Sequence, residues 1–283
     1  MFDTEKKCAE YLVEIKYPDG FTCSKCKHKE YWVTKRSTLK CQNCRSDFSL
    51  TVGTLLNKRH LPLTTWFEAI WFVTSQKVGV SSLGLGRALG IKRPMTSWKL
   101  LKDLRRGMSQ DGKDKLQNIV EIDEVFFGGI KKGPRGRGAL GKEMVLVAVE
   151  DKGEKGYGRI RMKIIPDAKS ETLLPVIKTL VEEKSSIRTD DHKSYLSLKD
   201  NNFTHLTTDK LVREAGQDST PLVHRIASLV KRWLLGTHQG GVHLPNLQDY
   251  LDEFVFRFNR RTSKSRGKLF DRLIQNMMRG GGK

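Results

Sequence analysis

The sequence predicts an α/β (α+β) protein in which a mixed sheet with flanking helices follows two small N-terminal modules. Three observations predict this architecture. Two C-x-x-C pairs stand near the N-terminus, three helical patterns follow over residues 62–108, and strand and helix patterns alternate from residue 118 onward. Three consecutive strands, followed by a helix, two strands and further helices, favour a mixed sheet covered by helices.

The charge of the chain indicates its partner. It has 283 residues, with 52 Lys plus Arg against 32 Asp plus Glu, and therefore a net charge of +20. An excess spread over many segments favours a polyanion, and nucleic acid is the commonest one. The sequence has no apolar run of membrane-spanning length and no signal-peptide core at its N-terminus. We therefore expect a cytoplasmic protein that binds nucleic acid and no membrane.

Residues 1–55 predict a short helix and a turn followed by a zinc ribbon. The two pairs Cys23/Cys26 and Cys41/Cys44 are separated by 14 residues of largely strand-forming composition. Two such turns can present four thiolates tetrahedrally to Zn²⁺. Disulfides and redox-active pairs are the alternatives, and a cytoplasmic location disfavours disulfides. Cys8 lies outside the pattern.

Residues 56–110 predict a helix-turn-helix region. Ser and Thr stand where the helices begin, and Gly79 and the Gly90-Ile91 pair mark the turns. The last helix is the most basic, so we expect it to face DNA. An ordinary helical linker with a solvated basic face is the alternative. The candidate DNA-binding residues are Arg93, Lys99, Lys102 and Arg105.

Residues 111–275 predict the α/β domain. Strands are expected at 118–129, 143–151, 158–167, 185–191 and 203–209, and helices at 170–184, 220–241 and 246–261. A glycine-rich basic loop, residues 131–142, joins the first two strands. Residues 276–283 are expected to form a disordered tail.

Two acidic positions in this domain predict a metal site. Asp123 stands inside the first strand and Asp190 ends the fourth. A carboxylate within a strand is costly unless it meets a cation, and ligands commonly bind at strand ends of such sheets. Carboxylate oxygens suit hard divalent cations, and two ions about 4 Å apart can drive phosphodiester chemistry. Taken singly, each acid is more simply a strand-end cap or a surface group.

A third ligand is expected from the helix that begins near residue 220. His224 and Lys231 are seven residues apart, nearly two helical turns, and therefore share a face. Imidazole can replace a carboxylate as a ligand, with a preference for Mn²⁺ over Mg²⁺, and the lysine would meet a phosphate. A polar, solvated helix face is the alternative for both. Glu214 and Asp218, in the preceding loop, rank below His224 as third ligands.

These motifs together resemble a known family. The chain is similar to bacterial insertion-sequence transposases that join a zinc ribbon to an RNase H-like domain of the DDE type, the ISXO2-like transposase domain. The matching segments run in family order over roughly residues 10–275 and read CSKC, CQNC, VEIDEVFFGG, RTDDHKSY, HRIASLVKRWLLGTHQGG and YLDEFVFRFNRRTSKSRGKLF. The resemblance implies that Asp123 and Asp190 are the first two catalytic acids. Many members carry Glu or Asn at the third position, and His224 with Lys231 fits a subgroup that carries His there. A shift of the alignment would put Asp191 in place of Asp190.

The resemblance implies a DNA transposase, bacterial and nucleoid-associated. It would bind terminal inverted repeats, cleave the strand and transfer the 3′-OH, with structural Zn²⁺ and catalytic Mg²⁺ or Mn²⁺. We expect a homodimer or higher oligomer on transposon ends and target DNA. Two alternatives remain: a metal-dependent nuclease without joining activity, and a non-enzymatic DNA-binding regulator with a degenerate catalytic domain.

Overall fold

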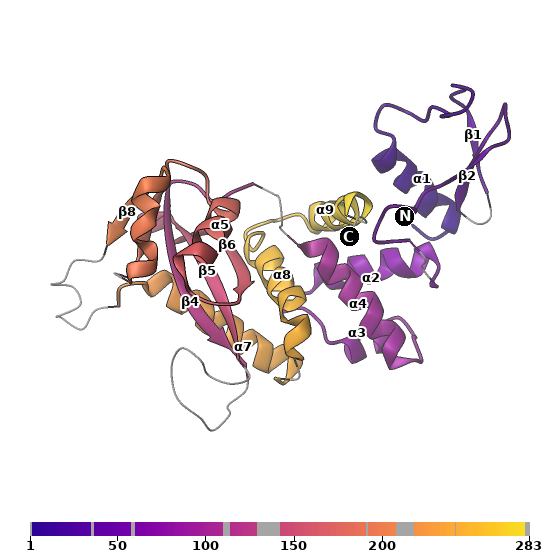
Figure 1. The fold of residues 1–283 in the computed structure, drawn as a ribbon. Coiled ribbons are helices and arrows are strands. Elements are labelled where there is room, and N and C mark those ends of the chain that lie inside the picture. Colours follow the sequence, from indigo (N-terminus) through magenta and orange to yellow (C-terminus); the bar gives the residue numbers. More distant parts are fainter. Residues whose placement is uncertain are drawn as a thin grey trace. The chain divides into compact units, whose positions relative to one another are not determined.

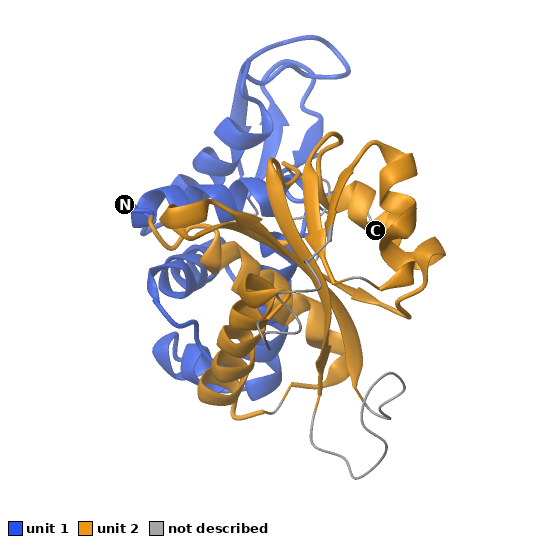
Figure 2. Ribbon diagram, turned by 90° about the vertical axis from the view of Figure 1, so that its left-hand side faces the viewer, with its two compact units in different colours: residues 1–108, 263–283 blue, residues 109–262 orange. Residues whose placement is uncertain are grey.

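The chain forms two compact units in a computed structural model (Figures 1 and 2). Unit 1 contains Met1–Met108 and Ser263–Lys283, and unit 2 contains Ser109–Thr262. The structure describes residues 2–34, 37–57, 60–109, 114–128, 142–190, 192–207, 218–240 and 242–280. None of the helices in these ranges combines the length and the apolar character that crossing a membrane requires.

Unit 1 joins a small three-stranded sheet to a group of helices. Its strands pair antiparallel in the order β1-β2-β3. Its elements are α1 (Glu5–Lys16), β1 (Tyr31–Val33), β2 (Thr38–Cys41), β3 (Asp47–Ser49), α2 (Leu63–Ser75), α3 (Ser82–Ala88), α4 (Pro94–Met108) and α9 (Arg266–Arg279). The three helical patterns expected over residues 62–108 are confirmed as α2, α3 and α4.

The C-terminal helix corrects the expected domain boundary. Residues 263–275 were expected in the α/β domain, but α9 packs with α2 and α4 in unit 1. Residues 276–279, expected in a disordered tail, form the last turn of α9. The reason is packing: Met277 is fully buried, and the side-chain amide of Asn276 donates a hydrogen bond to the Gly107 carbonyl at 2.9 Å. Residues 281–283 lie outside the described residues.

Unit 2 is built on a five-stranded mixed sheet with the order β6-β5-β4-β7-β8. The first three strands in sequence form an antiparallel meander, and the last two run parallel to β4. This confirms the mixed sheet predicted from the order of strands and helices. The strands are β4 (Ile119–Phe127), β5 (Glu143–Asp151), β6 (Tyr157–Ile165), β7 (Ser186–Thr189) and β8 (Thr204–Thr207).

Helical elements cover both faces of this sheet (Figure 1). One face packs on α5 (Ser170–Leu180) and η2 (Lys193–Asn201), and the other on α7 (Pro221–His238) and α8 (Leu247–Phe258). Side chains alternate along β4, since Val120 and Ile122 join the α5 core while Val125 and Phe127 join the α7 core. This alternation directs the odd-numbered residues of β4 toward α7.

The edge strand β6 is covered by amide side chains from α8 and the residue that follows it. The carboxamide of Gln248 accepts from Ile164 N at 3.0 Å and donates to Met162 O at 3.1 Å. The carboxamide of Asn259 likewise accepts a hydrogen bond from Ile160 N at 2.8 Å and donates one to Ile160 O at 3.0 Å. These amides occupy the backbone groups that an unpaired edge would offer to another chain.

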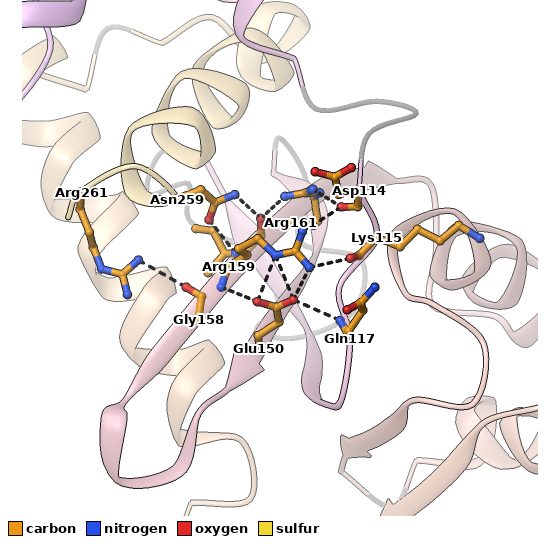
Figure 3. A network of polar contacts seen from close by, with 10 residues as sticks. Asp114, Lys115, Gln117, Glu150, Gly158, Arg159, Arg161, Asn259 and Arg261 are labelled. Atoms are coloured by element: carbon orange, nitrogen blue, oxygen red, sulfur yellow. Dashed lines mark hydrogen bonds and ion pairs between the residues drawn. The ribbon is translucent and has the colours of Figure 1, made fainter. Parts of the chain in front are cut away.

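A network of charged side chains at one end of β6 contacts the chain segments near the start and the end of unit 2 (Figure 3). Arg159 pairs with Glu150 at 2.6 Å and donates to the Lys115 carbonyl at 2.7 Å. Arg161 donates to the Asp114 carbonyl, and Arg261 donates to the Gly158 carbonyl at 3.3 Å. The entry at residues 114–117 and the exit at residues 259–261 are therefore fixed to one strand end.

Candidate active site

The four cysteines converge on one point of unit 1. The Cys23 and Cys44 sulfurs lie 3.5 Å apart, those of Cys26 and Cys41 lie 3.6 Å apart, and all four lie within 4.8 Å of one another. Tetrahedral Zn²⁺ with Zn–S bonds of about 2.3 Å places its sulfurs about 3.8 Å apart, so the cluster fits zinc. The Ser46 hydroxyl lies 3.3 Å from the Cys44 sulfur and lowers the pKa of that thiol to about 6, which favours the ligating thiolate.

The expected DNA-facing residues, which lie in α4 and directly before it, divide into exposed and buried groups. Arg93 and Lys99 are exposed and line a cavity of about 570 Å³. Lys102 is half-buried, with its ammonium 5.1 Å from the Trp98 ring centroid. Arg105 is only 3% exposed. It shares the inward face of α4 with the buried Leu101 and Leu104, so its placement among the DNA-facing residues is corrected.

Strand pairing in unit 2 brings the two predicted acids to adjacent strands, one inside β4 and one just beyond the end of β7. The parallel ladder pairs Val120 with Ile187 and Glu121 with Arg188. Asp123 lies two residues farther along β4, and Asp190 directly follows Thr189, the last residue of β7. Burial is the main cause that raises the pKa of Asp123, and the negative charge of Asp190 raises it further, as expected for neighbouring carboxylates. Asp190 itself accepts a hydrogen bond from the His192 amide at 3.1 Å.

The N-terminus of α7 brings His224 to these acids. Its Nε2 lies 3.4 Å from Asp123 Oδ2, and its Nδ1 lies 2.7 Å from Asp218 Oδ2. The Thr220 hydroxyl donates to the same Asp123 oxygen at 2.7 Å. The site thus places a strand carboxylate on one side of the imidazole and a loop carboxylate on the other. His224 remains open to ligands, with 54% of its side chain exposed.

Lys231 lies farther along the same helix. Its ammonium is 5.6 Å from the ring centroid of Phe127, at the end of β4, and its position is exposed. Partial burial, and then the charge of Lys142, lower the pKa of its ammonium. Seven residues of helix separate it from His224 by about 10 Å along the axis. Lys231 therefore contacts the rim of the site rather than the carboxylates.

The electrostatics of Asp123 favour a cation at this site. Burial is the largest effect and raises the pKa of Asp123, while hydrogen bonds from Thr220 and from the Glu124 amide act in the opposite direction. Within the described residues, the cysteines form the one cluster of three or more potential ligands that all lie within 4.8 Å of one another. Asp123, Asp190 and His224 are spaced more openly, and their oxygen and nitrogen donors suit Mg²⁺ or Mn²⁺.

Glu121, which is not among the residues expected from the sequence, anchors α7. This residue is fully buried, and its Oε1 accepts a hydrogen bond from Val223 N at 2.7 Å. Thr220 precedes the helix but forms no side-chain cap, because its hydroxyl is engaged by Asp123. Glu121 therefore satisfies an amide that an N-cap would otherwise serve. The signal was present in the sequence: Glu121 stands two residues before Asp123, on the same strand face.

Tyr195 and Glu124, which are also not among the residues expected from the sequence, interact on the opposite face of β4. The buried Tyr195 donates a hydrogen bond from its hydroxyl to Glu124 Oε1 at 2.5 Å. Burial, followed by the charge of Glu124, raises the pKa of Tyr195 well above its ordinary value, so the phenol stays protonated as a donor. Among the other expected residues, Asp191, Glu214 and the basic loop at 131–141 lie outside the described residues.

Comparison with known proteins identifies both parts of the chain. Residues 3–47 match the transposase zinc-ribbon domain, and residues 115–259 match the ISXO2-like transposase domain. A search of curated proteins found no match. A solved chain titled as the simian T-cell lymphotropic virus intasome in complex with PP2A regulatory subunit B56 gamma is 14% identical, with 72% of each chain covered and a TM-score of 0.32. Because the ISXO2-like match spans more than half of the sequence and the zinc ribbon precedes it, this chain belongs to the ISXO2-like transposase family.

Proposed function

We propose that this transposase binds the terminal inverted repeats of an insertion sequence. It would cleave a DNA strand at the ends of that insertion sequence and transfer the resulting 3′-OH to target DNA. The observation that carries the proposal is the convergence of Asp123, Asp190 and His224 from two adjacent strands and one helix. His224 Nε2 lies 3.4 Å from Asp123 Oδ2, and Asp190, directly after the adjacent strand β7, is near enough for its charge to act on Asp123.

Asp123, Asp190 and His224 are the residues that would hold the catalytic Mg²⁺ or Mn²⁺. When bound, these cations would activate the attacking oxygen and stabilise the leaving oxygen of an in-line displacement. The contact between His224 Nδ1 and Asp218 supports the role of the histidine, because a ligating imidazole commonly donates its other ring N–H to a carboxylate. On this assignment Asp218 orients His224 instead of replacing it as the third ligand.

One site would serve both reaction steps. In cleavage, a water oxygen bonds to phosphorus, the bond from phosphorus to the 3′-oxygen breaks, and that oxygen leaves as the 3′-OH. In joining, this 3′-OH bonds to a target phosphorus, and the target strand loses its own 3′-oxygen from that phosphorus. Lys231, about 10 Å from His224 along α7, is placed to neutralise a phosphate neighbouring the reacting one.

DNA would be held mainly by unit 1, with the cysteine cluster carrying a structural Zn²⁺. The exposed Arg93 and Lys99 beside the cavity on α4 supply positive charge for phosphates. Because two transposon ends must be processed together, we propose that the protein acts as a dimer or a larger assembly on DNA.

The test is a gel assay with the cognate ends and either Mg²⁺ or Mn²⁺. The wild-type chain should cleave and join, and Asp123→Ala and Asp190→Ala should abolish both steps while leaving end binding nearly intact. Cleavage without joining would identify a nuclease, and binding without metal-dependent cleavage would identify a regulator. An equal loss of DNA binding in the two alanine variants would make the acids structural.

A further inference from the structure

An aromatic groove on unit 1 stands apart from the cysteine cluster and from the basic face of α4. It is formed by α1, α2 and the start of α9, and has a volume of about 910 Å³. Its rings pack at centroid distances of 4.8–6.4 Å. They belong to Phe2, Tyr11, Phe67, Trp71 and Phe270. Trp71 is 51% exposed, so its ring remains open to a partner.

The rim of this groove is acidic. Five carboxylates and one lysine line it: Asp3, Glu10, Glu14, Glu68, Asp271 and Lys7. Lys7 is already paired with Asp3 at 2.8 Å, and Lys6 is paired with Glu10 at 3.8 Å. Asp271 accepts a hydrogen bond from Tyr11 at 2.7 Å. In the described part of the chain, neither Glu14 nor Glu68 has a basic side chain within ion-pair distance. The groove therefore carries uncompensated negative charge.

This local charge opposes that of the whole chain, which is +20. A rim of five acids and one base repels phosphate, so DNA does not fit the groove. A cationic side chain fits it well, because the carboxylates attract the charge and the exposed face of Trp71 offers a cation–π contact. Exposed aromatic side chains are also the commonest anchors of protein interfaces.

We propose that this groove docks a lysine- or arginine-bearing segment of a second copy of the same chain. Charge complementarity carries the choice of partner: each copy has 52 basic residues against 32 acidic ones, and this groove is an acidic surface on a basic molecule. The contact deepens the proposed assembly on transposon ends. It is tested without DNA or catalysis, so its failure leaves the strand-transfer proposal standing.

The experiment is sedimentation velocity of the zinc-loaded full chain, free of DNA, over a range of protein and salt concentrations. The wild-type chain should dimerise reversibly, and the effect of reversing charges in the groove should shrink as the salt concentration rises, because exposed charges are screened. Glu14→Lys combined with Glu68→Lys should weaken dimerisation at least about a hundredfold, and Trp71→Ala should also weaken it. Glu171→Lys combined with Glu183→Lys makes the same charge change at exposed sites of unit 2 and should leave the dimer unchanged.

Zinc content and the helical circular-dichroism signal should be the same in all variants. If the lysine pair misfolds, Glu14→Gln with Glu68→Gln replaces it, and its dimer should also be weaker than wild type. A wild-type chain that stays monomeric at every concentration would overturn the proposal. So would a charge-reversed groove that dimerises as tightly as wild type, or a control pair that weakens the dimer equally.

Discussion

The imidazole of His224 lies between two carboxylates, one near each ring nitrogen. Asp123 Oδ2 is 3.4 Å from Nε2, and Asp218 Oδ2 is 2.7 Å from Nδ1. A group of this kind can be tested residue by residue, because the proposal gives each carboxylate a different task. In that proposal Asp123 would share the reacting cation with the histidine, whereas Asp218 would only fix the orientation of the ring.

We predict that His224→Ala abolishes strand transfer, while Asp218→Asn lowers its rate about 10–100-fold, the usual cost of losing a carboxylate behind a ligating histidine. Binding of end DNA should stay near wild type in both, because neither residue is needed to hold the duplex. His243→Ala, at an exposed histidine beyond α7, is the matched control and should retain activity. Near-normal strand transfer by His224→Ala would refute the metal-ligand role.

At the scale of elements, the site depends on how α7 is attached to β4. The helix has no side-chain cap of its own, and Glu121 from the strand accepts the Val223 amide instead. The hydroxyl of Thr220, the residue before the helix, donates a hydrogen bond to Asp123. Glu121 and Asp123, both on β4, therefore fix the start of α7. His224 follows Val223, whose amide Glu121 accepts, so the same contacts set the position of His224.

We predict that Glu121→Ala lowers the free energy of unfolding by about 2 kcal/mol, because a buried amide loses its acceptor. Strand transfer should fall at least about tenfold, since a displacement of about 1 Å is costly in such a site. Glu121→Gln keeps an acceptor for Val223 N and should restore most of the activity. Glu253→Ala removes another fully buried glutamate, on α8, and is the control. Similar activity losses in Glu121→Ala and Glu253→Ala would indicate general destabilisation.

The network at the end of β6 gives a second prediction at this scale. Burial alone raises the pKa of Glu150, but hydrogen bonds from Arg159 and from the Gln117 amide outweigh it, and the net pKa is lowered below its ordinary value of 4.5. A lowered folded-state pKa contributes stability above pH 4.5, and this contribution is lost as the pH falls through the lowered value. Thermal melting should therefore show an acid-induced loss of stability that is smaller in Glu150→Gln. Exposed Glu171→Gln is the control and should keep the wild-type profile; an unchanged profile in Glu150→Gln would contradict the assignment.

At the scale of the whole molecule, the net charge of +20 predicts how DNA binding responds to salt. Phosphate contacts release counterions, so affinity for end DNA should fall steeply, by orders of magnitude, between about 50 and 200 mM salt. Arg93→Ala and Lys99→Ala should each weaken binding and reduce the salt slope by about one. Lys155→Ala, in a turn of unit 2, should change neither. Electrophoretic mobility shifts at several salt concentrations measure these effects, and a flat salt response would contradict the electrostatic argument.

The sequence by itself determined the features that depend on local spacing. Four cysteines in two turns specify a tetrahedral thiolate site, and strand patterns predict Asp123 inside one strand and Asp190 at the end of another. Periodicity also gave the three helices of unit 1. Each helix, strand and C-x-x-C turn follows from residues within a few positions of one another, where the period of a helix or a strand fixes which side chains share a face. The resemblance of these motifs to a transposase family is confirmed by the matches over residues 3–47 and 115–259.

Only the tertiary structure decided which distant residues meet. Arg105 reads as part of a basic face, yet packing buries it, because α4 turns that position toward its neighbours in unit 1. The last helix joins unit 1 through Asn276 and Met277, which lie more than 160 residues from their partner Gly107. Glu121 reaches α7 across 102 residues. Such contacts are set by the packing of whole elements, and no local period in a sequence encodes which elements pack together.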